Sequence, residues 1–293
     1  MDTERTFRRA RTIAELDAIE GFSTEEGERI GRTYRPDPTD IFISPYSKCG
    51  TTWMQQIVHG LRSGGSMNFS EVTEVVPWLE LAHDMGADVH APQVAAPRAF
   101  KSHLTWDEIP KGGRYIVVFR DPVDAMLSLY RFFEGWWFEA GSISVDAFAD
   151  YYLQRGGDYW EHAASWLRQR GRDDVLLVTF EEMKRNLPGV VDRVADFMGG
   201  YDAATRAIAT EQAGFDFMKR HGSQFDDHLV RQTRDAACGL PPGGSATKVA
   251  SGKTGGQISD DIRRRFEERW QEMIAQEFGL PTYSALDEAL QGK

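Results

Sequence analysis

Two apolar runs that each turn directly into a helix constrain the fold of this chain most. The first, IFIS at residues 41–44, is followed by the loop PYSKCG, and from Thr51 onwards apolar residues recur at helical spacing. The second, YIVVF at residues 115–119, precedes a helix in which Asp121 is a good N-cap and Pro122 suits the first position. Each unit predicts a buried strand, a tight turn and a helix.

The remaining sequence repeats this alternation. DVLLVTF at residues 174–180 indicates another buried strand, with helical patterns at 159–169 before it and 190–197 after it. PRAFKSHL at 97–104 indicates a short strand that runs into a loop, and 71–83 has a helical pattern disturbed by a proline. Strands that alternate with helices favour parallel pairing. We therefore predict a three-layer α/β fold, with a central parallel sheet flanked by helices.

The length favours a single domain over residues 1–293. Residues 1–40 are polar and charged and are predicted to be an extended lead-in. Residues 220–256 contain seven glycines around CGLPPGGS, which predicts a mobile, lid-like loop. SDDIRRRFEERWQEMIAQEF at 259–278 has one apolar helical face behind a Ser-Asp-Asp start.

Composition narrows the functional classes. A formal net charge of −11 argues against bulk attraction to nucleic acid or to an anionic membrane, so any anion site must be local. Cys49 and Cys238 are the only cysteines and lack metal or redox spacing, which favours a reduced, intracellular protein. Without an apolar stretch of about 18 residues or a signal pattern, membrane insertion is not expected and the cytoplasm is the predicted location. A homo-oligomer is compatible with the sequence, and no motif fixes the oligomeric state.

The loop after the first strand carries the chemistry of an anion site. Backbone N–H groups at a helix N-terminus point to one spot, and the helix dipole adds positive potential there. Gly50 permits close backbone approach, while Lys48 adds a mobile charge. The plainer alternative is a simple glycine turn beside a solvated lysine. The ATP- and GTP-binding pattern G-x-x-x-x-G-K-[ST] is absent, because Lys48 precedes the glycine and because Thr247 stands where GKT at 252–254 needs its first glycine.

These residues resemble the cytosolic-type sulfotransferases, which use 3′-phosphoadenosine 5′-phosphosulfate (PAPS) as donor. The family signature T-Y-P-K-S-G-T-T-W is similar to PYSKCGTTW, which retains Tyr46, Lys48, Gly50, Thr51, Thr52 and Trp53. A second signature, R-N/D-P-x-D-x-x-x-S-x-Y, is matched by Arg120, Asp121, Pro122, Asp124, Ser128 and Tyr130. Between them the family's K-T-H-L is matched by Lys101, Ser102, His103 and Leu104. The resemblance covers roughly residues 40–280 and implies the sulfotransferase form of the P-loop-NTPase-like fold.

The resemblance also implies how the donor would bind. PAPS would be the donor and 3′-phosphoadenosine 5′-phosphate (PAP) the product, with no metal required. Arg120 and Ser128 would clamp the 3′-phosphate, and the loop would hold the 5′ side through Lys48, Cys49, Gly50, Thr51 and Thr52. Trp53 would stack on adenine, with Phe180 standing where many relatives have tyrosine. The late motif R-K-G-x-x-G is only weakly matched by ASGKTG, where Gly252 is retained and Lys253 is a candidate for the missing charge.

Catalysis would centre on a histidine. His103 is the expected general base for the acceptor, because neutral imidazole can take a proton near physiological pH. Lys48, Lys101 and Ser128 complete the predicted catalytic group. The acceptor would be a small apolar or aromatic molecule that presents a hydroxyl or, less favoured, an amine.

An aromatic segment next to these motifs suggests where the acceptor binds. RFFEGWWFEAG at 131–141 places three aromatic residues just beyond the predicted helix, next to the donor motifs. An ordinary core role is the alternative, since aromatic residues at helical spacing usually pack inside a protein. The predicted pocket walls are Trp78, Met85, His103, Trp136, Trp137 and Phe138.

Two other functions stay open at this stage. A nucleotide kinase-like phosphotransferase could use the same architecture, although the missing GK[ST] pattern disfavours it. A nucleotide-binding relative without activity is the other alternative, because Ala250 and Ser251 replace the family's late basic pair.

Overall fold

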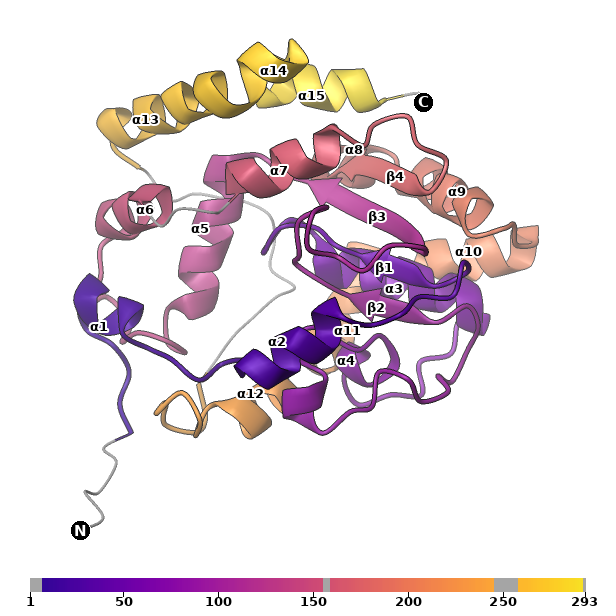
Figure 1. Cartoon of the computed structure of the whole chain (residues 1–293), viewed down its shortest axis with the longest axis horizontal. Coiled ribbons are helices and arrows are strands. Elements are labelled where there is room, and N and C mark those ends of the chain that lie inside the picture. Colours follow the sequence, from indigo (N-terminus) through magenta and orange to yellow (C-terminus); the bar gives the residue numbers. More distant parts are fainter. Residues whose placement is uncertain (1–6, 155–158, 245–257, 292–293) are drawn as a thin grey trace.

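The computed structural model describes residues 7–154, 159–244 and 258–291. At its centre lies a parallel sheet in the order β2-β1-β3-β4 (Figure 1). The strands are β1 (Ile41–Ile43), β2 (Ala99–Lys101), β3 (Arg114–Phe119) and β4 (Val175–Thr179). This confirms the predicted parallel sheet, with β4 shorter than expected because Phe180 begins the next helix.

Helices surround this sheet on both faces (Figure 1). Those before β3 are α1 (Ile13–Asp17), α2 (Glu25–Arg32), α3 (Thr51–Ser63), α4 (Val72–Val75) and the 3-10 turn η1 (His83–Met85). Between β3 and β4 lie α5 (Pro122–Phe133), α6 (Val145–Gln154) and α7 (Tyr159–Leu167). After β4 come α8 (Phe180–Arg185), α9 (Leu187–Phe197), α10 (Ala203–Gln212), α11 (Phe215–Arg220), η2 (Gly222–Phe225) and α12 (His228–Arg234). The C-terminal elements are α13 (Asp260–Trp270), the π-helical segment η3 (Gln271–Ala275), α14 (Gln276–Phe278) and α15 (Tyr283–Leu290).

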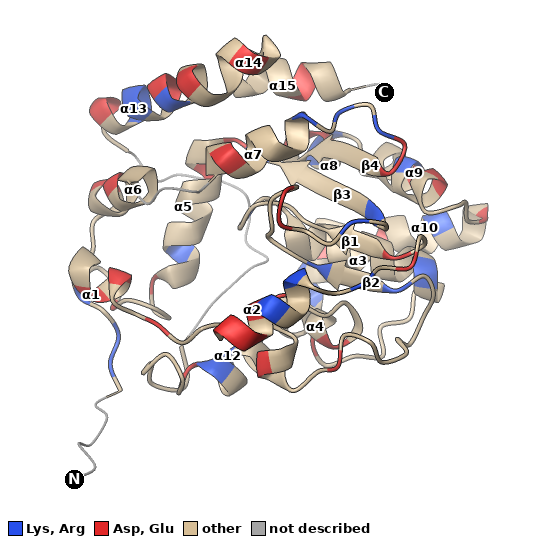
Figure 2. Ribbon diagram, viewed as in Figure 1, with Lys and Arg blue, Asp and Glu red and all other residues tan. Residues whose placement is uncertain are grey.

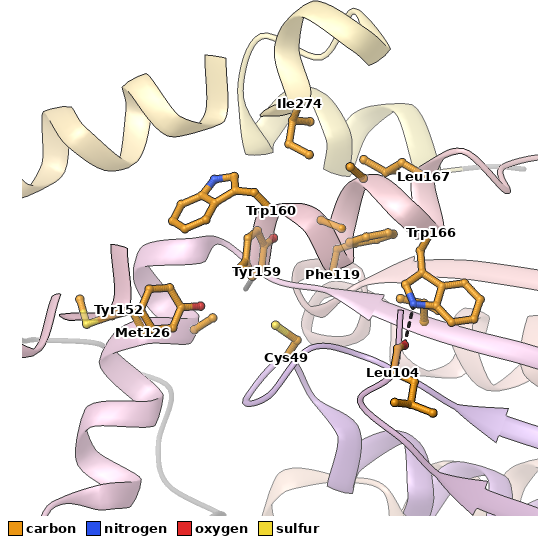
Figure 3. Close-up of a cluster of buried hydrophobic side chains, with 14 of the residues drawn as sticks. Cys49, Leu104, Phe119, Met126, Tyr152, Tyr159, Trp160, Trp166, Leu167 and Ile274 are labelled. Atoms are coloured by element: carbon orange, nitrogen blue, oxygen red, sulfur yellow. Dashed lines mark hydrogen bonds between the residues drawn. The ribbon is translucent and has the colours of Figure 1, made fainter. Parts of the chain in front are cut away.

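The strands supply two hydrophobic cores because successive side chains point to opposite faces of the sheet. Ile43 and Ile116 pack on one face with the buried side of α3. Phe42 and Tyr115 stack on the other face at 5.5 Å between ring centroids. Figure 3 shows part of this second core, where the Trp166 indole of α7 donates a hydrogen bond of 3.2 Å to the Leu104 carbonyl. The three-layer α/β prediction is therefore confirmed.

Three segments differ from the sequence-based prediction. The pattern at residues 71–83 forms only α4 and η1, with Pro77 between them. The lead-in at 1–40 contains α1 and α2, each with a threonine side chain as N-cap. The predicted loop at 220–256 contains α12, whose Arg234 donates hydrogen bonds to the Gly21 and Phe22 carbonyls. These hydrogen bonds connect α12 with a segment far away in the sequence. Local glycine content, on which the loop prediction rests, carries no information about such contacts.

The surface carries both signs of charge. Lys and Arg alternate with Asp and Glu along α2 and α13 in Figure 2. Among the described residues, no helix combines the length and the apolar character that crossing a membrane demands.

Candidate functional site

The N-terminus of α3 is shaped to receive an anion. Its N-cap, Gly50, has a φ of 101° and has no side chain with which to cap the first N–H groups of the helix. A Cβ at Gly50 would lie 3.0 Å from the Phe180 ring, so a larger residue would also crowd the site. The buried Thr51 hydroxyl has no hydrogen-bond partner among the described residues. An uncapped N-terminus with an unsatisfied hydroxyl favours an anionic ligand.

Arg120 brings the second strand-to-helix junction to the same place. Its Nη1 donates a hydrogen bond of 3.0 Å to the Lys48 carbonyl, and its guanidinium lies 4.4 Å from the centre of the Phe180 ring. Arg120 is buried, yet its Nε has no partner in the part of the chain that is described. The Tyr159 hydroxyl fixes the Arg120 carbonyl at 2.5 Å. The two predicted junctions are therefore in direct contact.

Aromatic rings border this site on one side. The Trp53 indole donates a hydrogen bond of 2.8 Å to the Ala213 carbonyl, and its ring meets Phe180 edge-on at 5.4 Å. Phe215 begins α11 two residues after Ala213 and is 44% exposed.

His103 lies just beyond β2 in a fixed tautomer. Its Nδ1 is 2.7 Å from the Pro45 carbonyl, which can only accept a hydrogen bond, so Nδ1 carries a proton and Nε2 is the nitrogen that would hold the lone pair of a neutral ring. The backbone N–H of His103 donates to Glu80 at 2.7 Å. Glu80 is buried, and burial raises the pKa of its carboxyl group. A general base at this position would need the neutral ring. Sequence reasoning missed Glu80 because it lies on the segment 71–83, outside every motif.

The two predicted catalytic lysines both lie over aromatic rings. Lys48 Nζ is 3.8 Å from the centre of Phe132, on α5. Lys101 Nζ is 3.5 Å from the centre of Trp78, and Lys101 is itself buried. Trp78 also meets the His103 ring edge-on at 5.1 Å. Trp78 is therefore a shared neighbour of Lys101 and His103, whereas Lys48 lies over a different ring.

An aromatic cluster adjoins His103 through Trp78. The cluster comprises Phe22, Trp78, Trp136 and Trp137, in which Phe22 lies 5.6 Å from Trp78 and from Trp137, and 6.4 Å from Trp136. Trp136 donates to the Asp235 carboxylate at 2.8 Å. Phe22 was not predicted, because it belongs to the lead-in and has no motif.

Other predicted pocket residues lie in different surroundings. Phe138 is fully buried between Tyr130 and Phe148, which is a core position and not a pocket wall, because its ring faces the helices α5 and α6. Met85 ends η1 and is half-buried. Ser128 is half-buried on α5. Gly252 and Lys253 lie outside the described residues.

Cys49 is fully buried in the loop, below Tyr159 (Figure 3). Burial raises the pKa of its thiol to about 12, so it is not a thiolate at neutral pH. The residue fills space within the loop.

A cavity of about 460 Å³ lies beside the start of α5. It is lined by Asp121, Val123, Asp124, Leu127, Glu181, Arg263 and Tyr283. Three carboxyl groups against one arginine make it a poor anion site. The α3 N-terminus and Arg120 are therefore the better candidate for an anion site.

The fold and this candidate site define an α/β protein with two strand-to-helix junctions brought side by side. A family model described as the sulfotransferase domain matches residues 38–276, and the chain belongs to that family.

Curated relatives and solved structures agree with this assignment. Human sulfotransferase 2B1 is 31% identical over 175 residues, which is 55% of this chain and 46% of that protein. Luciferin sulfotransferase of Photinus pyralis is 26% identical over 218 residues, 64% of this chain and 58% of that protein. The chain thus spans about half the length of the curated relatives it matches.

Among solved structures, retinol dehydratase in complex with androsterone and PAP superimposes with a TM-score of 0.67 at 17% identity, covering 86% of this chain and 85% of that one. Mouse sulfotransferase SULT7A1 complexed with PAP superimposes with a TM-score of 0.66 at 18% identity, and the match covers 92% of this chain and 94% of that one. These two likenesses establish the fold.

Proposed function

We propose that the protein transfers the sulfuryl group of PAPS to a hydroxyl, or less favoured an amine, of a small apolar or aromatic acceptor. The observation that carries this proposal is the contact between the Arg120 guanidinium and the Lys48 carbonyl, because it lets one ligand with two anionic ends touch both junctions. Membership of the sulfotransferase family supports it. The structural neighbours that contain PAP support the choice of donor.

The residues present suit this donor. The α3 N-terminus and the unsatisfied Thr51 hydroxyl would hold the 5′ side, with Thr52 and Lys48 beside them. Arg120, whose Nε lacks a partner among the described residues, would bind the 3′-phosphate together with Ser128. Trp53 and Phe180 offer aromatic faces for adenine.

Transfer then needs a base that takes the acceptor proton and positive charge that stabilises the leaving group. Nε2 of His103 takes the proton of the acceptor hydroxyl while its oxygen forms a bond to sulfur. The bond between sulfur and the bridging phosphate oxygen breaks, and PAP leaves with that electron pair. Lys48 and Lys101 supply positive charge for the developing anion. Because the chain itself provides these cations, we propose that no metal is needed.

The acceptor would lie against the aromatic cluster of Phe22, Trp78, Trp136 and Trp137. Rings at the sides and a histidine at one end suit an apolar molecule with one hydroxyl. Solved relatives contain androsterone or retinol, and both are molecules of this kind. We also propose a cytoplasmic location, in keeping with the family resemblance.

Calorimetric titration with PAP, ATP and GTP tests the donor assignment. We expect PAP to bind much more tightly than ATP or GTP, whereas preference for ATP would favour the kinase-like alternative. Transfer of radiolabelled sulfate from PAPS to a panel of phenols and alcohols tests activity. Tight PAP binding without transfer to any member would favour an inactive nucleotide-binding relative.

A further inference from the structure

The C-terminal helix α15 lies beyond residues 38–276, yet it contacts the strand that leads to Arg120. Tyr283, its first residue, donates a hydrogen bond of 3.1 Å to the Phe119 carbonyl. The same hydroxyl is hydrogen-bonded to the Glu181 carboxyl group of α8. Figure 1 shows α15 next to α7 and α8, on the side of the sheet where β3 and β4 end. Three elements thus meet at one hydroxyl group.

A tyrosine hydroxyl has one proton and here faces two acceptor groups. If Tyr283 donates to the Phe119 carbonyl, the bond to Glu181 is complete only when the carboxyl group is protonated and donates to the tyrosine oxygen. Burial raises the pKa of Glu181, whereas the hydrogen bond from Tyr283 lowers it. Burial also raises the pKa of Tyr283 well above its ordinary value, so the phenol keeps its proton.

Glu181 and Arg120 interact electrostatically, so the contacts of the Tyr283 hydroxyl lie beside the guanidinium. In addition, the carbonyls of Phe119 and Arg120 are both fixed by tyrosine hydroxyls, one from Tyr283 and one from Tyr159.

We propose that Tyr283 is a positioning residue for the donor site: its hydroxyl fixes the backbone before Arg120, so that the guanidinium is held where it can bind the 3′-phosphate. This inference rests on the proposed function, because it assumes a donor with a 3′-phosphate. It assigns a role in donor recognition to a helix outside the family-matched region.

The test compares two nucleotides that differ only in the 3′-phosphate, PAP and AMP. Dissociation constants of both are measured by calorimetry for the full chain and for Tyr283→Phe. We expect the preference for PAP over AMP to fall about 3- to 10-fold, the effect of one lost hydrogen bond. If Tyr283 had a purely structural role, the variant would bind both nucleotides more weakly by the same factor. An unchanged preference for PAP over AMP would therefore overturn the inference.

Tyr115→Phe is the matched control. Its buried hydroxyl also donates to a backbone carbonyl, that of Pro110 at 2.7 Å, from the same strand but away from Arg120. We expect the control to keep the wild-type preference for PAP over AMP. An equal fall in the control would contradict a specific role for Tyr283.

Glu181→Ala provides a second test that does not depend on the folding of the first variant. We expect a reduced preference for PAP, because the hydrogen-bonded chain to Tyr283 and Phe119 is broken. An increased preference would show that Glu181 is the counter-ion of Arg120, and would overturn the inference. If wild type itself binds PAP no better than AMP, the proposed function fails instead, so the two failures are distinct.

Discussion

The Arg120 guanidinium donates a hydrogen bond to the backbone carbonyl of Lys48, 72 positions away in the sequence. This contact joins the ends of β1 and β3, which are neighbours in the sheet. Because both strands are parallel, their following loops lie at the same edge. A ligand at the α3 N-terminus therefore lies within reach of the guanidinium.

Arg120→Ala is expected to weaken PAP binding by about 10- to 150-fold, because a charged hydrogen-bond donor is lost. Calorimetric titration measures the change. AMP, which lacks the 3′-phosphate, serves as the control ligand and should lose far less affinity. Wild-type PAP affinity in the variant would contradict the clamp.

His103→Ala should keep PAP affinity and lose turnover, with kcat reduced by about 10²- to 10⁴-fold. The reason is that Nε2 carries the lone pair while Nδ1 is committed to the Pro45 carbonyl. Steady-state kinetics with saturating PAPS and titration with PAP give the two quantities. A variant with near wild-type kcat would remove the general base assignment.

Asp235→Ala should raise the KM for the acceptor about 3- to 10-fold, because Trp136 loses the partner of its indole N–H. PAP affinity should stay unchanged. Asp235→Asn is the control, since its side-chain oxygen can still accept the hydrogen bond. Equal KM values for the two variants would argue against the assignment of Trp136 to the proposed acceptor pocket.

Acid should destabilise the protein through His162, which is fully buried on α7. Burial lowers the pKa of its imidazole to about 3, whereas in the unfolded chain the ring binds a proton near its ordinary value of 6.5. The unfolded state therefore binds more protons as pH falls from 6.5 towards 3, and stability is lost in that window.

Replacing His162 by Gln should remove this contribution. Between pH 6 and 4 the wild type should lose about 1.4 kcal/mol of unfolding free energy per pH unit more than the variant. Urea titrations at several pH values measure the unfolding free energy of the wild type and of the variant. Parallel pH profiles would show that His162 is not the titrating group.

Cys49 should resist alkylation in the native protein, because burial raises the pKa of its thiol to about 12. Cys238→Ser leaves it as the single cysteine. Mass spectrometry after iodoacetamide treatment at pH 8 should detect no modification until urea unfolds the chain. Rapid native labelling would mean that the loop opens.

Local sequence determined most of the secondary structure near the site. Strand β3 follows from a run of β-branched and aromatic residues, and α5 begins where Asp121 caps the backbone N–H groups of Val123 and Asp124. The parallel sheet follows from strands alternating with helices. These features depend on residues a few positions apart, so periodicity and capping patterns reveal them.

Tertiary structure alone decided which side chains share the site. Phe22, Glu80 and Tyr283 come from segments without a motif, yet each contacts the acceptor cluster, His103 or the strand before Arg120. Phe138, in contrast, packs into the core despite its place in the aromatic segment. Contacts between residues far apart in the chain arise from the packing of whole layers, which one-dimensional patterns do not encode.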